Sequence, residues 1–203
     1  MPTDSQVAAQ NPHGRWRLAE IVPLLALTLW AYWGCLRNPF HFDDSLFLSS
    51  PQVTEPGDPV HFLKPSQSRQ LFYLSLFLNY RLGGANPRSY HLFNLILHLA
   101  NTLGIYLLAR LLCRRKSDLS DSLIRRWLSF VAAGIFALHP IQTQPVNYVY
   151  QRSTLLAAFF TLAAMCAFVW TEQTRRRGVF FVLAGVFFIL AAASKESALV
   201  LPH

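Results

Sequence analysis

Residues 90–112, YHLFNLILHLANTLGIYLLARLL, form an apolar stretch long enough to cross a bilayer. A spanning helix needs about 20 residues, since each adds about 1.5 Å of rise. Four polar side chains are spaced three, four and three residues apart, so they lie on one face of the helix: His91, Asn94, His98 and Asn101. This face is expected to turn away from lipid, either to form interhelical hydrogen bonds or to line a substrate cavity. The two histidines lie about 10 Å apart along the axis, too far to share one zinc ion.

Apolar stretches flank this segment on both sides. The sequence predicts about five transmembrane spans, at residues 18–36, 90–112, 128–147, 153–171 and, shorter, 178–193. A hydrophobic fraction of 53% favours a membrane protein. The 18 basic residues form short runs between the apolar stretches rather than one amphipathic face, which argues against a nucleic-acid partner. We therefore predict an all-α, polytopic membrane helical bundle.

The basic runs predict the orientation of these spans. The positive-inside rule places in the cytoplasm Arg15, Arg17, Arg110, Arg114, Arg115, Lys116, Arg125, Arg126, Arg175, Arg176 and Arg177. Residues 1–17 are then a cytoplasmic tail, and residues 18–203 a membrane domain with an outer loop at 37–89. The outer face would be periplasmic, extracytoplasmic or in the lumen of the endoplasmic reticulum.

Ionisable residues gather at the predicted outer face. They are Asp43, Asp44, Arg69, His139, Arg152, Lys195 and Glu196. Each ionisable group at membrane depth costs about 2.5–3.5 kcal/mol on insertion scales, so such groups usually pair or line a wet cavity. The alternative is that they reach toward lipid headgroups. For the two acids, Arg152 and the Lys195–Glu196 pair we favour convergence on one site, because they follow successive spans.

Two irregular segments should lie at the same face. Residues 71–80 are apolar but too short to span, and they end at a Gly83–Gly84 breaker, which predicts an interfacial helix. This helix is either a simple anchor or one wall of a cavity. Pro140 should break the third span, leaving His139 and Gln144 near the outer face.

Four segments carry a family resemblance. They are FHFDDSLFLSSPQV (40–53), SRQLFYLSLFLNYRLGGANPRSYHLFNLILHLAN (68–101), FALHPIQTQPVNYVYQRSTLLAAFF (136–160) and AAASKESALVLP (191–202). In order and spacing they resemble the N-terminal membrane part of the transmembrane and tetratricopeptide-repeat proteins. That family is related to protein O-mannosyltransferases among the GT-C glycosyltransferases. The resemblance runs from about Asn38 to the end of the chain, and the motifs are specific only as a set.

The resemblance implies transfer of a sugar from a polyprenyl-phosphate donor to an acceptor protein or glycan at the non-cytoplasmic face. An acidic motif in the first outer loop then supplies a catalytic carboxylate, which would be Asp43, with Asp44 orienting it. Substrate-binding candidates are Arg152 and Lys195 for the donor phosphate, then Arg69 and His139, with Gln144 and Glu196 alongside. No firm cofactor is implied. Adjacent acids can bind a divalent cation, although two carboxylates make a poor cage.

The chain also departs from the family pattern. A proline often follows the arginine at position 69, where this chain has Gln70, and a glutamate often stands where Gln144 does. No repeat of about 34 residues is present in the 203, so we interpret the chain as a fragment or a truncated product. The alternative function is a non-catalytic membrane anchor or assembly partner. A transporter is disfavoured, because no pair of matching interrupted helices is evident.

Overall fold

The computed structural model describes residues 12–41, 43–44, 51–54, 69–115 and 122–199. Every regular element in these ranges is a helix, which confirms the predicted all-α fold. The elements are α2 (Pro12–Tyr32), η1 (Trp33–Arg37), α4 (Pro51–Thr54), α5 (Gln70–Gly83), α6 (Pro87–Arg115), α7 (Ser122–Leu138), η3 (Pro140–Gln142), α8 (Thr143–Asn147), η4 (Val149–Gln151), α9 (Arg152–Thr171), α10 (Arg177–Ser194) and η5 (Glu196–Leu199).

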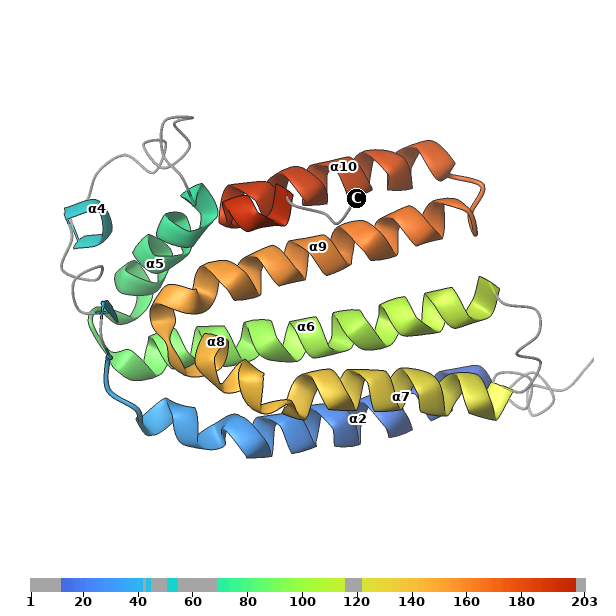
Figure 1. The fold of residues 1–203 in the computed structure, drawn as a ribbon, viewed down its shortest axis with the longest axis horizontal. Coiled ribbons are helices and arrows are strands. Elements are labelled where there is room, and N and C mark those ends of the chain that lie inside the picture. The colour runs from blue at the N-terminus through green and yellow to red at the C-terminus, as the bar shows by residue number, and fades with distance from the viewer. Residues whose placement is uncertain (1–11, 42, 45–50, 55–68, 116–121, 200–203) are drawn as a thin grey trace, which may run out of the picture.

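The long helices run along a common axis as a bundle (Figure 1). Helix α6 lies at its centre and contacts α2, α7 and α9, while α10 packs against the far side of α9. Gly104 allows α6 and α9 to approach closely, because an added Cβ would lie 3.2 Å from Cδ1 of Leu162. Residues 90–112 therefore lie in the central helix of the bundle, against which α2, α7 and α9 pack.

Three of these helices are long and apolar enough to cross a membrane. The qualifying ranges are Pro87–Cys113, Val149–Thr171 and Arg177–Ser194. They correspond to the second, fourth and fifth predicted spans. Helices α2 and α7 run beside them (Figure 1), so the prediction of about five spans stays a prediction. The third predicted span, 128–147, is interrupted before Pro140 as its proline predicts, and its helix α7 covers Ser122–Leu138.

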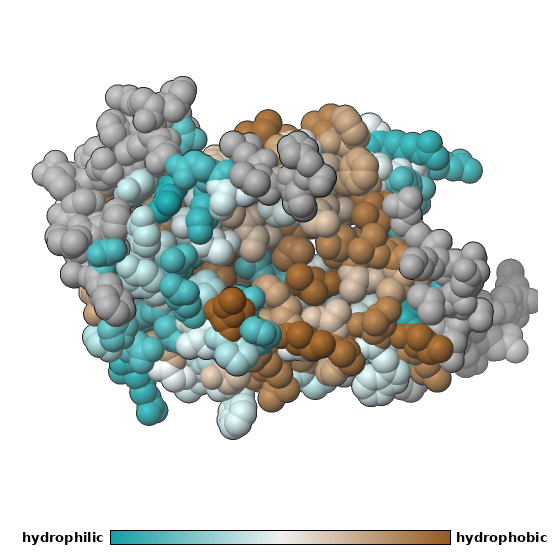
Figure 2. Space-filling view, in the orientation of Figure 1, coloured by the Kyte–Doolittle hydropathy of each residue, from teal (hydrophilic) through white to brown (hydrophobic). Residues whose placement is uncertain are grey.

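The surface of the bundle carries an apolar belt between two polar ends. Figure 2 shows hydrophobic residues gathered over the middle of the bundle, with hydrophilic residues at either end. On α10, apolar side chains such as Phe181, Val182 and Ile189 are about two-thirds exposed. A belt of this kind is costly in water and suited to the hydrocarbon core, which supports a membrane protein.

Helix α5 confirms the predicted short helix of the loop between the first two spans. Its last residue precedes Gly84, which adopts φ 58° and donates its N–H to the Tyr80 carbonyl. This left-handed conformation favours glycine and ends the helix. Phe72 and Leu76 are buried, and α5 covers one end of the bundle against α4, α9 and α10.

The two ends of the bundle differ. We call the end with α5, α8 and η4 the broken-helix end, and the end with the turn between α9 and α10 the basic end (Figure 1). At the basic end, Glu20 of α2 accepts hydrogen bonds from Tyr106 and Arg110 on α6 and from Arg126 on α7. We call these four residues the Glu20 cluster. It ties three helices together, and sequence reasoning did not single out Glu20.

Candidate functional site

The broken-helix end is built by a proline-induced interruption. Helix α7 ends at Leu138, and His139 is extended (φ −64°, ψ 131°) immediately before Pro140. A residue before proline is driven to extended geometry, since the proline ring clashes with its backbone. The chain then makes the short turns η3, α8 and η4 before α9 begins. This confirms the predicted break and leaves residues 139–151 folded over the end of the bundle.

An open hollow of about 740 Å³ lies at this end. Its lining comes from the segment after η1 and from the broken segment: His41, Asp43, Pro140, Ile141, Thr143, Gln144, Asn147 and Tyr148. The two segments are tied across the hollow, since Asn38 donates its Nδ2 to Oδ1 of Asn147 over 3.1 Å. Of the predicted site residues, Asp43 and Gln144 therefore share one concave surface.

The adjacent acids Asp43 and Asp44 have different environments. Asp44 is 1% exposed and accepts the backbone N–H groups of Val149 (3.3 Å), Tyr150 (3.0 Å) and His41 (3.3 Å). The bonds from Val149 and Tyr150 satisfy donors that the broken helix leaves without intrahelical partners. Asp44 thereby holds η4 against the segment that follows η1.

Asp43 is exposed and lies at the hollow. Its Oδ2 accepts a hydrogen bond of 3.2 Å from the Tyr148 hydroxyl. Partial burial and the neighbouring Asp43 carboxylate both raise the pKa of Tyr148 above its ordinary value. Tyr148 is therefore a protonated donor at neutral pH. Sequence reasoning did not name Tyr148 as a site residue, although Tyr148 stands only four residues before Arg152, which it did name.

Arg152 is 0% exposed at the start of α9. Its guanidinium donates to Oδ1 of Asn94 (2.8 Å), to Oδ1 of Asn79 (3.0 Å) and to the carbonyls of Tyr90 (3.1 Å) and Ser75 (3.3 Å). It also lies 4.6 Å from the ring centroid of Phe93. A planar guanidinium with several donors suits such a multidentate site. Arg152 joins α5, α6 and α9 beneath the hollow, whereas the sequence predicted that it would reach the donor phosphate.

A second group of polar residues surrounds Tyr150. Arg69 donates to the Tyr150 hydroxyl over 2.6 Å and lies 3.9 Å from a Glu196 carboxylate oxygen. Its backbone adopts φ 59°, which is uncommon for a residue other than glycine and recurs at functional sites. The Tyr148 and Tyr150 ring centroids are 5.9 Å apart, so this group adjoins the hollow. The structure thus brings Arg69 and Glu196 together, and Tyr150 and Tyr148 lie between them and Asp43.

Lys195 follows the last turn of α10 and is half-buried. It donates its Nζ to Oγ1 of Thr154 over 2.8 Å, and Thr154 donates to Oε1 of Gln151 over 2.9 Å. Because Glu196 is the next residue, Lys195 belongs to the same end of the bundle. His139 is exposed, and its Nδ1 accepts the Ile141 N–H over 3.2 Å at the start of η3. Its contact is local to the helix break.

The four polar residues of the α6 stripe are all 0% exposed. Asn94 also donates to the Val146 carbonyl (3.4 Å), His98 lies 3.0 Å from the Ala137 carbonyl, and Asn101 donates to the Leu155 carbonyl (3.1 Å). Asn94, His98 and Asn101 therefore make hydrogen bonds to neighbouring segments, which is one of the two roles expected for this helix face. His91 is buried near the segment that carries Asn38 and Asp44. A cavity-lining role for these residues stays a prediction.

Metal binding has little support in the described ranges. Within them, no three His, Cys, Asp or Glu side chains come together closely enough to hold an ion. Asp43 and Asp44 point to different partners, and together they offer two carboxylates where a calcium site uses six to eight oxygen ligands. The residues that line the hollow instead offer one exposed carboxylate, the Tyr148 hydroxyl and the side-chain amides of Gln144 and Asn147.

These features define a class: a helical membrane bundle with an open polar hollow at the end where one helix is broken. Comparison with known proteins makes that class specific. The chain is 31% identical over 172 residues to protein O-mannosyl-transferase TMTC2 of Mus musculus, and the match covers 78% of the chain. It is 27% identical over 191 residues to protein O-mannosyl-transferase TMTC3 of Homo sapiens, a match that covers 87% of the chain. It is also 27% identical over 196 residues to protein O-mannosyl-transferase F38B6.6 of Caenorhabditis elegans, a match that covers 90% of the chain.

These homologues confirm the resemblance to the transmembrane and tetratricopeptide-repeat proteins, and they are glycosyltransferases. The chain spans only 19–26% of the length of these three relatives. No family model and no solved structure matches the chain.

Proposed function

We propose that this chain contributes the acidic part of the active site of a membrane glycosyltransferase. The sugar, mannose by analogy with the relatives' names, passes from a polyprenyl-phosphate donor to an acceptor protein hydroxyl. The observation that carries the proposal is that the two adjacent acids differ in burial and in hydrogen-bond partners. Asp44 is buried on three backbone N–H groups, and Asp43 is held exposed at the hollow beside Tyr148.

The chemistry follows from this difference. Asp43 takes the proton of the acceptor hydroxyl as its oxygen bonds to the anomeric carbon of the sugar. The bond from that carbon to the donor phosphate oxygen breaks, and the polyprenyl phosphate leaves with the electron pair. Arg69 and Lys195 are the cations placed to stabilise the departing phosphate, since both lie at the broken-helix end and are half-buried rather than enclosed.

The phosphate role that the sequence predicted for Arg152 is not part of this proposal. The guanidinium is fully buried and donates to four oxygens of the protein itself. Binding a phosphate would require breaking some of those bonds. We propose that Arg152 instead positions α5 and η4, on which Arg69 and Tyr150 depend.

The test is glycosyl transfer by the full-length protein carrying Asp43→Asn or Asp44→Asn at matched membrane abundance. Asp43→Asn should leave the unfolding temperature unchanged and lower the transfer rate about 10²–10⁴-fold, because only the proton acceptor is removed. Asp44→Asn should lower stability by about 1–3 kcal/mol, since an amide nitrogen cannot accept the backbone N–H bonds. Undiminished transfer by Asp43→Asn would rule out the base assignment.

We also propose that the broken-helix end faces away from the cytoplasm, as the basic runs at the other end favour. Ala85 and Gln173 are exposed at opposite ends of the bundle. In a background without other cysteines, Ala85→Cys should react with a membrane-impermeant thiol reagent applied to the non-cytoplasmic side, and Gln173→Cys should react only after permeabilisation. The reverse pattern would invert the orientation.

One observation favours the non-catalytic anchor as a second candidate. Gln144, at the position where the family pattern often has a glutamate, lines the hollow beside Asp43. The hollow therefore has one acid fewer than that pattern implies. If the unmodified full-length protein transfers no sugar across a broad panel of donors and acceptors, the anchor becomes the better conclusion.

A further inference from the structure

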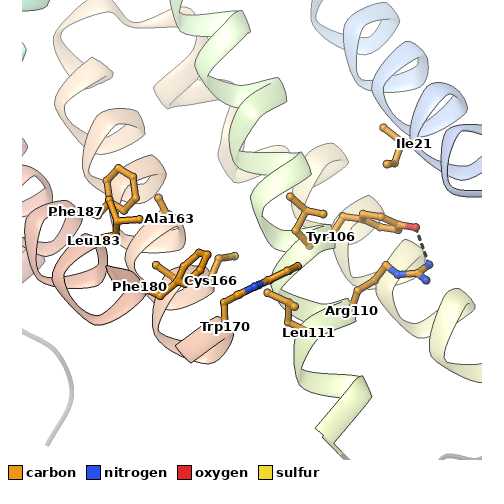
Figure 3. Close-up of a pocket in the computed structure, with 12 residues that line it drawn as sticks. Ile21, Tyr106, Arg110, Leu111, Ala163, Cys166, Trp170, Phe180, Leu183 and Phe187 are labelled. Atoms are coloured by element: carbon orange, nitrogen blue, oxygen red, sulfur yellow. Dashed lines mark hydrogen bonds between the residues drawn. The ribbon is translucent and has the colours of Figure 1, made fainter. Parts of the chain in front are cut away.

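A second pocket, of about 350 Å³, lies toward the basic end between α6, α9 and α10 (Figure 3). Its lining is almost entirely apolar. Ala163 and Ala167 leave the space on α9, while Leu111 of α6 and Phe187 of α10 form opposite sides. Ala163 and Trp170 lie seven residues apart on one helix, about 10 Å along its axis, so the pocket extends parallel to the helices. This is the direction in which an acyl chain lies in a bilayer.

The end of the pocket nearest the basic end of the bundle is polar. Arg110 lines it and donates through Nη1 to Glu20 (3.3 Å) and to the Tyr106 hydroxyl (3.0 Å). Its Nε and Nη2 have no hydrogen-bond partner within the ranges that the structure describes. Trp170, 40% exposed, extends from α9 towards Leu111 of α6 (Figure 3), a placement typical of the interface between headgroups and acyl chains.

The surrounding charge is predominantly positive, since Arg110 and Arg126 share the single carboxylate of Glu20, and the turn between α9 and α10 carries one acid, Glu172, beside three arginines. Arg175, Arg176 and Arg177 are all exposed at the turn between α9 and α10, a few residues beyond Trp170. An anionic headgroup at Arg110 would therefore meet a predominantly positive surface and a guanidinium with two donor nitrogens, Nε and Nη2, to offer. We propose that this pocket binds one acyl chain of an anionic phospholipid, whose phosphate pairs with Arg110.

The size of the pocket favours an acyl chain over a protein helix. A helix is about 10 Å wide with its side chains, so a space of about 350 Å³ admits side chains but no backbone. Apolar side chains inserted here would also supply no acceptor to Nε and Nη2 of Arg110, whose side chain is only 22% exposed. A phospholipid fills the apolar part and supplies that acceptor.

The proposal is tested with the full-length protein reconstituted in mixed phosphatidylcholine and phosphatidylglycerol nanodiscs. After extraction into mild detergent, native mass spectrometry counts the phospholipids that remain bound. The unmodified protein should retain phosphatidylglycerol in preference to phosphatidylcholine. Arg110→Gln should lower that preference about tenfold, because a charge-assisted hydrogen bond of about 1.5 kcal/mol or more is lost.

Ala167→Trp should abolish retention of either lipid by filling the pocket. Met165→Trp is the matched control, since Met165 lies on the same helix, is 45% exposed and is not part of the pocket lining. If Ala167→Trp fails to fold, the lipid preference of Arg110→Gln decides the question alone. No retained phospholipid in the unmodified protein, or an unchanged preference in Arg110→Gln, would overturn the proposal.

Discussion

At the basic end of the bundle Glu20 is shared between two arginines and a tyrosine, whereas at the broken-helix end Asp43 is exposed and accepts a hydrogen bond from Tyr148. The difference follows from the backbone. At the basic end three continuous helices run past one another, and their side chains pair across the contacts. At the other end Pro140 interrupts α7, and the short turns leave N–H groups that Asp44 accepts.

This contrast shows how an exposed carboxylate can be held at a fixed place. Asp44 accepts backbone N–H groups of η4, and the buried Arg152 bonds to α5 and α6 immediately after η4. The irregular backbone is therefore stabilised without Asp43. Arg152 bonds to amide and carbonyl oxygens, whereas the Glu20 cluster joins opposite charges. The contrast therefore predicts different responses when each centre is altered.

The largest effect is expected for Arg152→Gln. Asn79, Asn94 and two backbone carbonyls would lose their donor in a fully buried site, and each unpaired buried group costs about 1–3 kcal/mol. We expect the free energy of unfolding in detergent to fall by about 3–5 kcal/mol in total, with Arg152→Lys also destabilised, because a single ammonium cannot reach all four acceptors.

The control for this change is Arg88→Gln, which removes an exposed arginine from the first turn of α6. Its stability should match that of the unmodified protein. If Arg152→Gln unfolded like the control but bound the lipid-linked donor more weakly, Arg152 would be a phosphate ligand, as the sequence predicted, and its structural role would be wrong.

Local pattern predicted much of this architecture. The spacing of His91, Asn94, His98 and Asn101 placed them on one face, and Pro140 and Gly84 marked a helix break and a helix end correctly. Each of these signals acts within a few residues of the chain. The beginning of α7 was placed at residue 128 rather than Ser122 because Arg125 and Arg126 are charged. The structure continues the helix through them, and Arg126 bonds to Glu20 across the bundle.

The roles within the site depend on long-range contacts that no local pattern records. Asp43 and Asp44 are neighbours with the same chemistry, and only the position of η4, more than 100 residues later, distinguishes them. Arg152 is predicted from the sequence as a ligand of the donor phosphate, because ionisable groups at membrane depth pair or line a wet cavity. Its burial follows from acceptors on α5 and α6 that the sequence does not show to be close.

A smaller effect is expected for Glu20→Gln at the basic end. The change removes the negative charge that Arg110 and Arg126 share, but both arginines are partly exposed and water can replace some of the loss. We expect stability to fall by about 1–2 kcal/mol, and by less at high salt. The transfer rate should stay the same, since the cluster lies at the opposite end from Asp43.

The control for Glu20→Gln is Glu172→Gln, an exposed acid in the turn between α9 and α10. A loss of stability equal in the two variants would mean that net charge, rather than the Glu20 cluster, stabilises the basic end. A fall in transfer without a fall in stability would mean that the two ends are coupled.

The smallest effect is expected for Tyr148→Phe, which removes the hydroxyl that Asp43 accepts. This bond lies at an exposed carboxylate, so the free energy of unfolding should change by about 0.5 kcal/mol or less near pH 8.

The effect of Tyr148→Phe on stability has a defined pH dependence. Since the pKa of Tyr148 is raised in the folded protein, first by partial burial and then by Asp43, the folded state retains the tyrosine proton where the unfolded state begins to lose it. The stabilisation is therefore complete below the ordinary tyrosine pKa of about 10 and disappears as the pH rises through the folded value. Unfolding measured for both proteins between about pH 8 and pH 11 should show the unmodified protein losing its small advantage over Tyr148→Phe. A difference that grew with pH would show that ionised Tyr148 is stabilised in the fold, which is incompatible with a tyrosine hydroxyl donating to Asp43.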